Sequence, residues 1–406
     1  MQLRCESEIW SMIDSDDPYQ EILNIKLALD NYYVTKKGFL QDLKLVTITI
    51  LSLFTPKRMG HYLFIKLLKI AKSYNVKKIG FNEKSIHMTN KFNLNKYEVF
   101  NDDVKFYNII SKKTDVIIFA ASGLTSLDLL LKILKSGKIV GIANKECIIT
   151  LGKRFISLSK KFKTKIIPLD SEHNSIYHLL SQNLGKYKSI TITATGGPFL
   201  HYTKNELSSV TPQQAIRHPV WNMGSKISID SATMMNKALE IIEAKYLFNL
   251  KNNEINAIIH PQAIIHALIN YENGISTALL NKPDMRIPIS SLFFGFNKYS
   301  NAYSGIELTD YLNFEFIPID KNKFPAVELG YQVMKVGGLA PHIFNYLNEI
   351  LVNLFIKKRI KFLDIVKLNE VNMDKFFGKN SNIANPKLRD IKNINNWIDN
   401  NLYLGN

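Results

Sequence analysis

Apolar and polar positions alternate in blocks along much of the chain. Apolar runs of strand length lie at 45–51, 76–81, 114–122 and 138–146, and amphipathic segments lie at 61–74 and 126–137. Strands that alternate with helices predict βαβ units and a parallel sheet, so the expected fold class is α/β. Such sheets bind ligands at the carboxyl ends of their strands, where the polar residues 144–146 are expected.

A different pattern follows residue 160. Apolar runs at 163–169 and 189–195 end in polar or glycine-rich tips, and two alternating runs flank Asn273-Gly274, a dipeptide typical of a hairpin turn. We therefore predict a central α+β domain over 161–290. Residues 291–315 have the composition of a linker, and apolar residues at helical spacing predict a helical domain over 316–406. Residues 1–44 show weak periodicity and form an unassigned N-terminal extension.

Composition is ordinary for a globular protein except for an excess of basic side chains. The 406 residues include 52 Lys and Arg against 35 Asp and Glu, a formal net charge of +17. This charge favours anionic small molecules, but no basic stripe is interleaved with aromatic residues, so we expect no nucleic-acid partner. The apolar stretches are too short or too interrupted to span a bilayer. Two distant cysteines, Cys5 and Cys147, indicate no disulfide framework, and we expect a cytoplasmic protein without a membrane partner.

An acidic cluster follows one of the predicted strands. Asp170, Ser171 and Glu172 come directly after the apolar run 163–169, and in an extended chain Asp170 and Glu172 point to the same side. Two neighbouring carboxylates repel unless a proton or a cation lies between them. Together with Glu240 they offer hard oxygen ligands, which suit Mg²⁺ or Mn²⁺ better than zinc.

The segment DSATMMNKALE, residues 230–240, offers a second feature of the same kind of site. Asp230 or Ser231 is expected to be the N-cap of a helix, whose free N–H groups suit a phosphate. Asn236 and Glu240 are four residues apart and share one helix face. The alternative for this segment alone is a capped amphipathic helix whose polar residues are solvated.

Longer motifs make the sequence similar to a known family. They are GIANKE, PLDSEHNSI, TGGPF, RHPVWNMGSKISIDSATMMNKALE, HPQAIIH, KPDMRIPI and NYLNE, in this order between residues 141 and 349. With them the chain resembles the 1-deoxy-D-xylulose 5-phosphate reductoisomerases, which belong to non-mevalonate isoprenoid biosynthesis. The resemblance implies a Rossmann-like NADPH-binding domain over 45–160. It also implies that 161–290 bind metal and substrate and contribute a sheet to a homodimer.

The resemblance assigns roles to individual residues. The implied metal ligands are Asp170, Glu172 and Glu240. The implied catalytic residues are Lys145, Glu172, His218 and Glu240. The implied substrate contacts are Lys145, Ser171, Glu172, Thr195, His218, Trp221, Met223, Ser231, Asn236, Lys237 and Glu240. The implied cofactor contacts are Asn144, Glu146, Gly224, Gly60 and Lys84. The polar, glycine-containing segment 217–230 has the composition of a mobile lid.

The implied reaction rearranges and reduces 1-deoxy-D-xylulose 5-phosphate to 2-C-methyl-D-erythritol 4-phosphate, with NADPH and Mg²⁺ or Mn²⁺. A divalent metal polarises the ketone of such a substrate, and a phosphate held away from the reacting carbons helps to fix its geometry. The expected partners are therefore a small phosphosugar and, in a homodimer, a second copy of the chain.

One segment departs from the family pattern. The family has a glycine-rich phosphate loop after its first strand, whereas residues 52–60 read SLFTPKRMG and retain only Gly60. Leu53 and Phe54 place bulk where a pyrophosphate approaches the backbone, and Pro56 lacks an N–H donor. The alternative to an active enzyme is a catalytically impaired relic that binds metal and sugar phosphate but not NADPH.

Two milder departures lie close to the motifs that bind substrate. Thr195 stands where the family usually has serine, and it keeps the hydroxyl group. Ala238 stands where the family usually has glycine, so its methyl group must find space in the fold.

Four further residues have simpler interpretations. His260 and His266 lie on an apolar segment and are predicted to be structural. His173 either supports a metal ligand or is itself structural. Cys147 has no base at readable spacing and is predicted to be a small buried residue.

Overall fold

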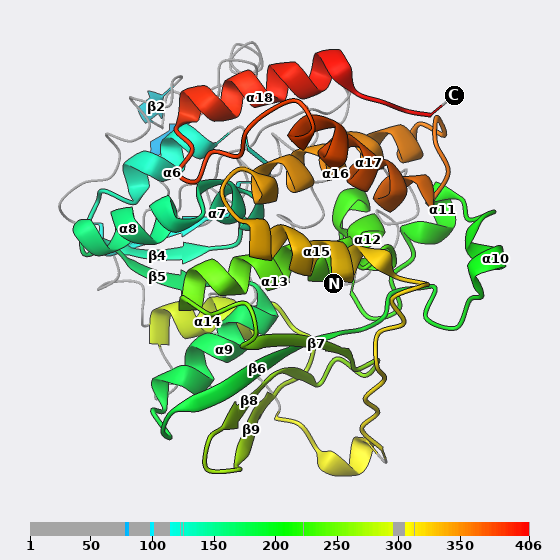
Figure 1. Ribbon diagram of the computed structural model, residues 1–406. Helices are drawn as coiled ribbons and strands as arrows, with labels where there is room; N and C mark the ends of the chain where they lie inside the picture. Colours follow the sequence, from blue (N-terminus) through cyan, green and yellow to red (C-terminus); the bar gives the residue numbers. More distant parts are fainter. Residues whose placement is uncertain are drawn as a thin grey trace.

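Parallel and mixed β-sheets surrounded by helices make up the fold (Figure 1). The computed structural model describes residues 78–80, 98–100, 114–121, 123–124, 126–221, 223–294, 305–311 and 313–405. The predicted α/β class is confirmed. The extension 1–44, the strand predicted at 45–51 and the helix predicted at 61–74 lie outside these ranges.

Parallel strands build the first part of the fold, as the alternating pattern predicts. β1 (Lys78–Gly80) pairs with β2 (Glu98–Phe100), and β3 (Val116–Phe119), β4 (Ile139–Ile142) and β5 (Lys165–Pro168) form a second parallel sheet. The helices here are α6 (Leu127–Ile133), α7 (Lys145–Leu151) and α8 (Lys153–Lys161). The register pairs Ile142 with Pro168, so the polar residues that follow β4 and β5 emerge at the same edge.

A mixed sheet forms the lower part of Figure 1. Its strands, in spatial order, are β7 (Ile255–Ile259), β6 (Tyr187–Ala194), β8 (Ile265–Tyr271) and β9 (Ser276–Leu280). The predicted hairpin joins β8 to β9, and Gly274 in its turn has φ of +85°, a conformation that favours glycine. α9 (Ser171–Ser181) packs on this sheet and places the acidic cluster near its rim.

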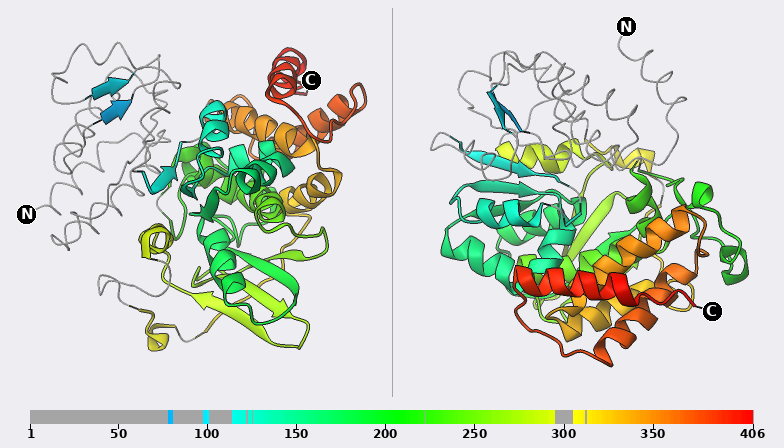
Figure 2. Two further views of the ribbon diagram at one scale, coloured as in Figure 1. Left: turned by 90° about the vertical axis from the view of Figure 1, so that its left-hand side faces the viewer. Right: turned by 90° about the horizontal axis from the view of Figure 1, so that it is seen from above.

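Helices cover the mixed sheet and form the C-terminal region, which Figure 2 shows on one side of the molecule. They are α10 (Lys204–Leu207), α11 (Pro212–Ala215), α12 (Ser225–Ala232), α13 (Met235–Phe248), α14 (Arg286–Phe294), the 3₁₀ helix η2 (Leu308–Asp310), α15 (Pro325–Val336), α16 (Ala340–Ile356), α17 (Asp364–Phe377) and α18 (Leu388–Asn401). The predicted helical C-terminal region is confirmed. Within the described ranges, every helix is too short or too polar to cross a bilayer.

α13 is the central helix of the fold. It lies between the mixed sheet and the C-terminal helices in Figure 1 and contacts α7, α12, α15 and β7. Its apolar residues Met235, Leu239 and Ile242 are fully buried. Gly330 of α15 allows a close approach, because a Cβ atom there would lie 2.7 Å from the Cβ of Ala238. The methyl group of Ala238 therefore finds its space over a glycine of the facing helix.

The expectation of an extended chain at the acidic cluster was wrong. Asp170 occupies the N-cap position of α9, and Ser171 and Glu172 lie in its first turn. An aspartate followed by a glutamate is a favourable helix start, because both complement the free N–H groups and the helix dipole. Glu172 is therefore presented by a helix rather than by the tip of β5.

The expected helix start at Asp230 or Ser231 was also wrong. Both residues lie in the last turn of α12, and α13 begins only at Met235. The helical conformation is interrupted at Met234. Its φ of +61° is left-handed, which is uncommon for a residue other than glycine. Because α12 begins at Ser225, the non-helical part of the predicted lid ends at Gly224.

Replacing Gly330 by alanine should destabilise the protein by about 1–2 kcal/mol, because the overpacking against α13 exceeds the gain in helix propensity. The free energy of unfolding in urea, followed by circular dichroism, measures this change. Adding Ala238→Gly should not recover the loss, because a Cβ atom at position 330 would still lie 2.9 Å from the Cα of residue 238 and glycine lowers helix propensity. Unchanged stability of the single variant would contradict the close packing of α13 and α15.

Candidate active site

One pocket collects the polar residues that the sequence singles out. It opens beside α7, α9, α12 and α13, near the carboxyl ends of β4, β5 and β6. Its lining residues are Ala143, Lys145, Leu169, Asp170, Ser171, Glu172, Ala194, Thr195, His218, Trp221, Met223, Ile227, Ser231, Met234, Asn236, Lys237, Glu240 and Met285. Every implied substrate contact belongs to this lining. The fold thus brings together residues from separate parts of the sequence, while their individual roles stay predictions.

The implied metal ligands converge in this pocket. Asp170, Glu172 and Glu240 each offer a carboxylate oxygen, and these oxygens lie within 4.8 Å of one another. Asp170 and Glu172 come from the start of α9, whereas Glu240 comes from α13 and has a side chain only 1% exposed. The packing of α9 near α13 therefore creates the acidic cluster.

Two lysines hold the acidic cluster together. Lys145 Nζ lies 2.9 Å from Asp170 Oδ2 and 3.2 Å from Glu240 Oε1. Lys237 Nζ lies 2.7 Å from Glu172 Oε1 and also contacts the other Glu240 oxygen. Burial alone would lower both lysine pKa values. Asp170 and Glu240 nevertheless raise the pKa of Lys145 well above its usual range, and Glu172 and Glu240 raise the pKa of Lys237.

The acidic cluster fits a hard divalent cation. Its carboxylates outnumber the ammonium groups of the two lysines, and burial together with Glu172 raises the pKa of Glu240. A cation among the three ligand oxygens would remove this excess of negative charge. Carboxylate oxygens are the ligands that Mg²⁺ and Mn²⁺ prefer, so the donor set agrees with the predicted metal.

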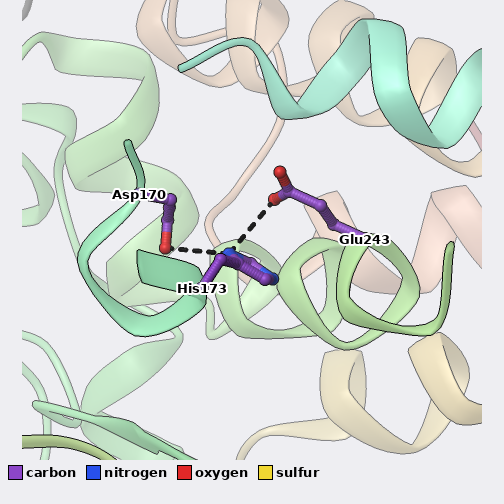
Figure 3. Close-up of side chains that lie close together, drawn as sticks. All are labelled: Asp170, His173 and Glu243. Carbon is purple, nitrogen blue, oxygen red and sulfur yellow. Dashed lines mark hydrogen bonds and ion pairs between the residues drawn. The ribbon is translucent and has the colours of Figure 1, made fainter. Parts of the chain in front are cut away.

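His173 lies between Asp170 and Glu243, as Figure 3 shows. Its Nε2 donates to the backbone oxygen of Glu240 at 3.0 Å, because a carbonyl oxygen can only accept. Its Nδ1 lies 3.0 Å from Asp170 Oδ1 and 3.5 Å from Glu243 Oε2. Burial opposes a charge on the ring, but Glu243 and Asp170 raise the pKa of His173 to about 9. The imidazolium therefore fixes Asp170 and Glu240, two of the implied metal ligands, relative to each other, which favours the supporting interpretation of His173.

Glu243 is a site residue that the sequence reasoning missed. It is 2% exposed, burial raises its pKa to about 7, and its Oε2 makes no hydrogen bond with the described residues. A signal was present, because Glu240 and Glu243 are three residues apart on one helix and share a face. The spacing could not show that His173 of α9 packs against that face of α13.

Groups suited to a phosphate gather where α12 ends and α13 begins. The left-handed Met234 turns the chain, so that Ser231 at the end of α12 and Lys237 at the start of α13 line the same pocket. Gly197 lies against this break, because a Cβ atom there would be 2.9 Å from the backbone oxygen of Ser231. The free N–H groups of a helix start provide a positive site for an anion, while the Lys237 ammonium group is shared with Glu172 and Glu240.

Hydrogen bonds define the tautomer of His218. Its Nδ1 accepts from the backbone N–H groups of Val220 at 3.1 Å and Trp221 at 2.9 Å, so the neutral ring has its proton on Nε2. Nε2 lies 3.0 Å from Thr195 Oγ1, which also accepts from the backbone N–H of Gly197 at 3.2 Å. Burial lowers the pKa of His218 to about 4. His218 is therefore a fixed neutral donor, and Thr195 keeps its hydroxyl hydrogen for a further acceptor.

The implied cofactor contacts are described only in part. Gly60 and Lys84 lie outside the described residues, as does the segment 52–60. Gly224 occupies the N-cap position of α12, and Glu146 Oε1 lies 3.3 Å from Lys226 Nζ. Glu146 of α7 thus contacts the first turn of α12.

The side chain of Asn144 forms hydrogen bonds inside the protein instead of pointing freely toward a cofactor site. It is 2% exposed, it accepts from the backbone N–H of Cys147 at 2.7 Å, and it donates to the backbone oxygens of Ala121 and Gly123. All its side-chain hydrogen-bonding groups are used inside the protein. Asn144 therefore ties the start of α7 to the segment that follows β3.

The residues with simpler interpretations are all buried. His260 and His266 are 0% and 3% exposed, and neither belongs to a cluster suited to a metal among the described residues. Cys147 is fully buried, and its thiol contacts the backbone oxygen of Gly123 at 3.5 Å. These positions agree with the structural roles predicted for them.

The His218 tautomer can be observed directly. In protein labelled with ¹⁵N-histidine, long-range ¹H–¹⁵N correlation spectra should show a neutral ring with its proton on Nε2. Because the pKa of His218 is lowered to about 4, this state should persist from about pH 8 down to about pH 5, where an ordinary histidine becomes charged. The variant His218→Asn assigns the signal, and a proton on Nδ1 at neutral pH would contradict the hydrogen-bond assignment.

Comparison with known proteins places this site in a family. A family model described as 1-deoxy-D-xylulose 5-phosphate reductoisomerase matches residues 59–152, and a model of its C-terminal domain matches 166–248. A model described as the DXP reductoisomerase C-terminal domain matches 280–400. The reductoisomerase of Chlamydia felis is 40% identical over 257 residues, which are 63% of this chain and 68% of the relative. That of Wolbachia pipientis wMel is 38% identical over 342 residues, 82% of this chain and 86% of the relative.

Solved structures agree with the sequence relatives. The chain is similar to the Zymomonas mobilis reductoisomerase in complex with NADPH, with a TM-score of 0.75 and 30% identity over 86% of this chain and 96% of the other. It is also similar to a DOX-P reductoisomerase in complex with NADPH, fosmidomycin and magnesium, with a TM-score of 0.75, 26% identity, and 88% and 97% of the two chains covered. This chain therefore belongs to the 1-deoxy-D-xylulose 5-phosphate reductoisomerase family.

Proposed function

We propose that the protein converts 1-deoxy-D-xylulose 5-phosphate to 2-C-methyl-D-erythritol 4-phosphate, using NADPH and Mg²⁺ or Mn²⁺. The observation that supports this most directly is one pocket whose lining combines an acidic cluster with ammonium, amide and hydroxyl groups. A ketose phosphate offers the matching groups, which are oxygens for a metal and a phosphate for the hydrogen-bond donors.

The hydrogen-bond donors of the pocket bind the substrate phosphate, away from the reacting carbons. Lys237 and Asn236 at the start of α13 contact Glu240 and, together with Ser231 and Thr195, offer their remaining ammonium, amide and hydroxyl hydrogens to the phosphate oxygens. His218 adds a donor that does not change its charge near neutral pH. Binding energy from the phosphate can hold the sugar in a reactive geometry.

The acidic cluster orients the reacting part of the substrate. Asp170, Glu172 and Glu240 would hold the divalent metal, which polarises the substrate carbonyl when bound, while NADPH supplies the reducing equivalents. Lys145 offsets part of the negative charge of the cluster, and its ammonium group can donate a hydrogen bond to a substrate oxygen. Trp221 and Met223 line the pocket from the loop before α12, where they would exclude water from the reacting carbons.

The impaired-relic alternative depends on residues 52–60, which lie outside the described residues. None of the described contacts distinguishes it from an active enzyme, because metal and phosphate binding are common to both. NADPH binding is the property that separates the two.

Two further proposals concern assembly and location. β9 is an edge strand that pairs only with β8 among the described strands, and Ile275 in the hairpin turn is 57% exposed. We propose that this edge belongs to a homodimer interface, because a free strand edge can pair with a second copy. The two cysteines, of which Cys147 is buried and free, fit a cytoplasmic location.

Activity tests the proposed reaction. Purified protein with 1-deoxy-D-xylulose 5-phosphate and Mn²⁺ should oxidise NADPH, followed by its absorbance. Glu240→Gln should lower kcat/KM by about 100-fold or more, because it removes a buried carboxylate from the metal site. Glu328→Gln, which loses a surface ion pair with Lys321, is the matched control. NADPH that binds without turnover would contradict the proposed reaction, and absent NADPH binding with intact Mn²⁺ binding would favour the relic.

The proposed dimer has its own test. Sedimentation velocity should give twice the mass of one chain, and Ile275→Lys should shift the protein toward the monomer, because a charge opposes burial of this position. A matched Leu184→Lys variant changes another exposed apolar residue, 48% exposed and on the loop before β6. Equal dissociation of both variants would argue against the hairpin edge as the interface.

A further inference from the structure

A second buried charge cluster lies behind the pocket and does not line it. Lys226 Nζ is 2.8 Å from Asp230 Oδ2, both on α12, and 3.3 Å from Glu146 Oε1 on α7. The Asp230 side chain is only 1% exposed and that of Glu146 16%. Although burial opposes a charge, Asp230 and Glu146 raise the pKa of Lys226 above its usual range. This ion-pair cluster therefore fastens α12 to α7.

Asn348 of the C-terminal helix α16 completes the cluster. Its Nδ2 donates to Asp230 Oδ1 at 2.8 Å, and the residue is fully buried. Asp230 consequently has one oxygen bound by Lys226 and the other by Asn348. The orientation of the Asn348 amide is fixed, because only its nitrogen can donate to a carboxylate. One buried carboxylate thus connects three helices that are far apart in the sequence.

Two residues of this cluster are sequence neighbours of residues that line the pocket. Asp230 immediately precedes Ser231, and Glu146 immediately follows Lys145, which contacts the acidic cluster. A change in the distance between α7 and α12 would therefore change the distance between Ser231 and Lys145 in the pocket lining. Displacements of about 1 Å at such groups can lower rates substantially.

Loss of the Asn348 amide would disturb this arrangement in a specific way. Asp230 Oδ1 would remain buried without its donor, and an unsatisfied buried carboxylate oxygen is strongly unfavourable. Glu349, next to Asn348 on α16, lies in the same electrostatic environment, since burial raises its pKa and Lys226 lowers it. With three carboxylates near one ammonium group, the Asn348 amide is the donor that holds Asp230 Oδ1 in place.

We propose that Asn348 and Asp230 are positioning residues, through which the C-terminal helix α16 sets the spacing between Ser231 on α12 and Lys145 on α7 in the lining of the substrate pocket. This inference rests on the proposed function for its kinetic consequences. Its structural consequence, a coupling of α16 to α7 and α12, is independent of the reaction.

The test compares two buried asparagines in the C-terminal region. Asn348→Ala should lower kcat and raise KM for 1-deoxy-D-xylulose 5-phosphate, with kcat/KM reduced about 10- to 100-fold. Asn372→Ala removes a buried amide that donates to the backbone oxygens of Leu368 and Tyr403, far from the cluster. It should lower the unfolding temperature without changing kcat/KM at temperatures where the protein stays folded.

An exchange of the two groups provides a rescue. Asn348→Asp alone places two carboxylates face to face and should be at least as harmful as Asn348→Ala. Combining it with Asp230→Asn restores one amide–carboxylate hydrogen bond and the original total charge, and should recover part of kcat/KM. No recovery in a folded double variant would oppose the proposal.

Hydrogen exchange measured by mass spectrometry gives a readout that needs no turnover. Asn348→Ala should increase exchange in residues 143–151 and 224–233, whereas Asn372→Ala should affect only residues around 368–403. Active wild-type protein whose Asn348→Ala variant keeps its kcat/KM would overturn the inference and leave the proposed function intact. Inactive wild-type protein would overturn the proposed function, and the exchange pattern alone would then decide the inference.

Discussion

The pairing of buried charges on α13 is the interaction on which the rest of the structure depends. The side chains of Lys237 and Glu240 are 4% and 1% exposed, and charges in such positions are tolerated only with partners within a few ångströms. Because one helix does not supply enough partners, Lys145 must come from α7 and Glu172 from α9. The need for charge balance therefore fixes the relative positions of three helices, and the pocket forms where their carboxylate oxygens meet.

Two further buried contacts, one made by His173 and one by Asp230, connect these helices to their neighbours. His173 links the Asp170 side chain to the backbone of Glu240, and so determines how α9 meets α13. Asp230 links α12 to α16 through Asn348, and so connects the helix that contains Ser231 to the C-terminal region. In both cases a buried polar side chain makes hydrogen bonds on two sides. Such networks allow little adjustment, because a half-satisfied buried group costs more than the interaction gains.

The sequence predicted the elements whose signals are local. The parallel strands, the hairpin at Gly274 and the helical C-terminal region follow from periodicity and turn chemistry, and the motifs located every residue of the pocket assigned to substrate. The helix break at Met234 was missed, because a left-handed methionine has no signature comparable to that of glycine. The pairs His173–Glu243 and Asp230–Asn348 were missed for another reason. Each joins residues far apart in the sequence, and helical spacing shows which face a residue occupies but not what packs against it.

The contact between α13 and α15 shows how a departure from the family pattern is accommodated without a change in the site. Ala238 lies between Lys237 and Leu239 on the helix that supplies the metal-site carboxylate Glu240. If residue 330 were larger than glycine, α13 would have to move away from α15 and toward α7, and the distances of Lys145 to its carboxylate partners would change. Because Gly330 leaves space for the methyl group of Ala238, α13 packs closely against α15. The steric fit between Ala238 of α13 and Gly330 of α15 is therefore a condition for the charge pairing of Lys237 and Glu240 on α13.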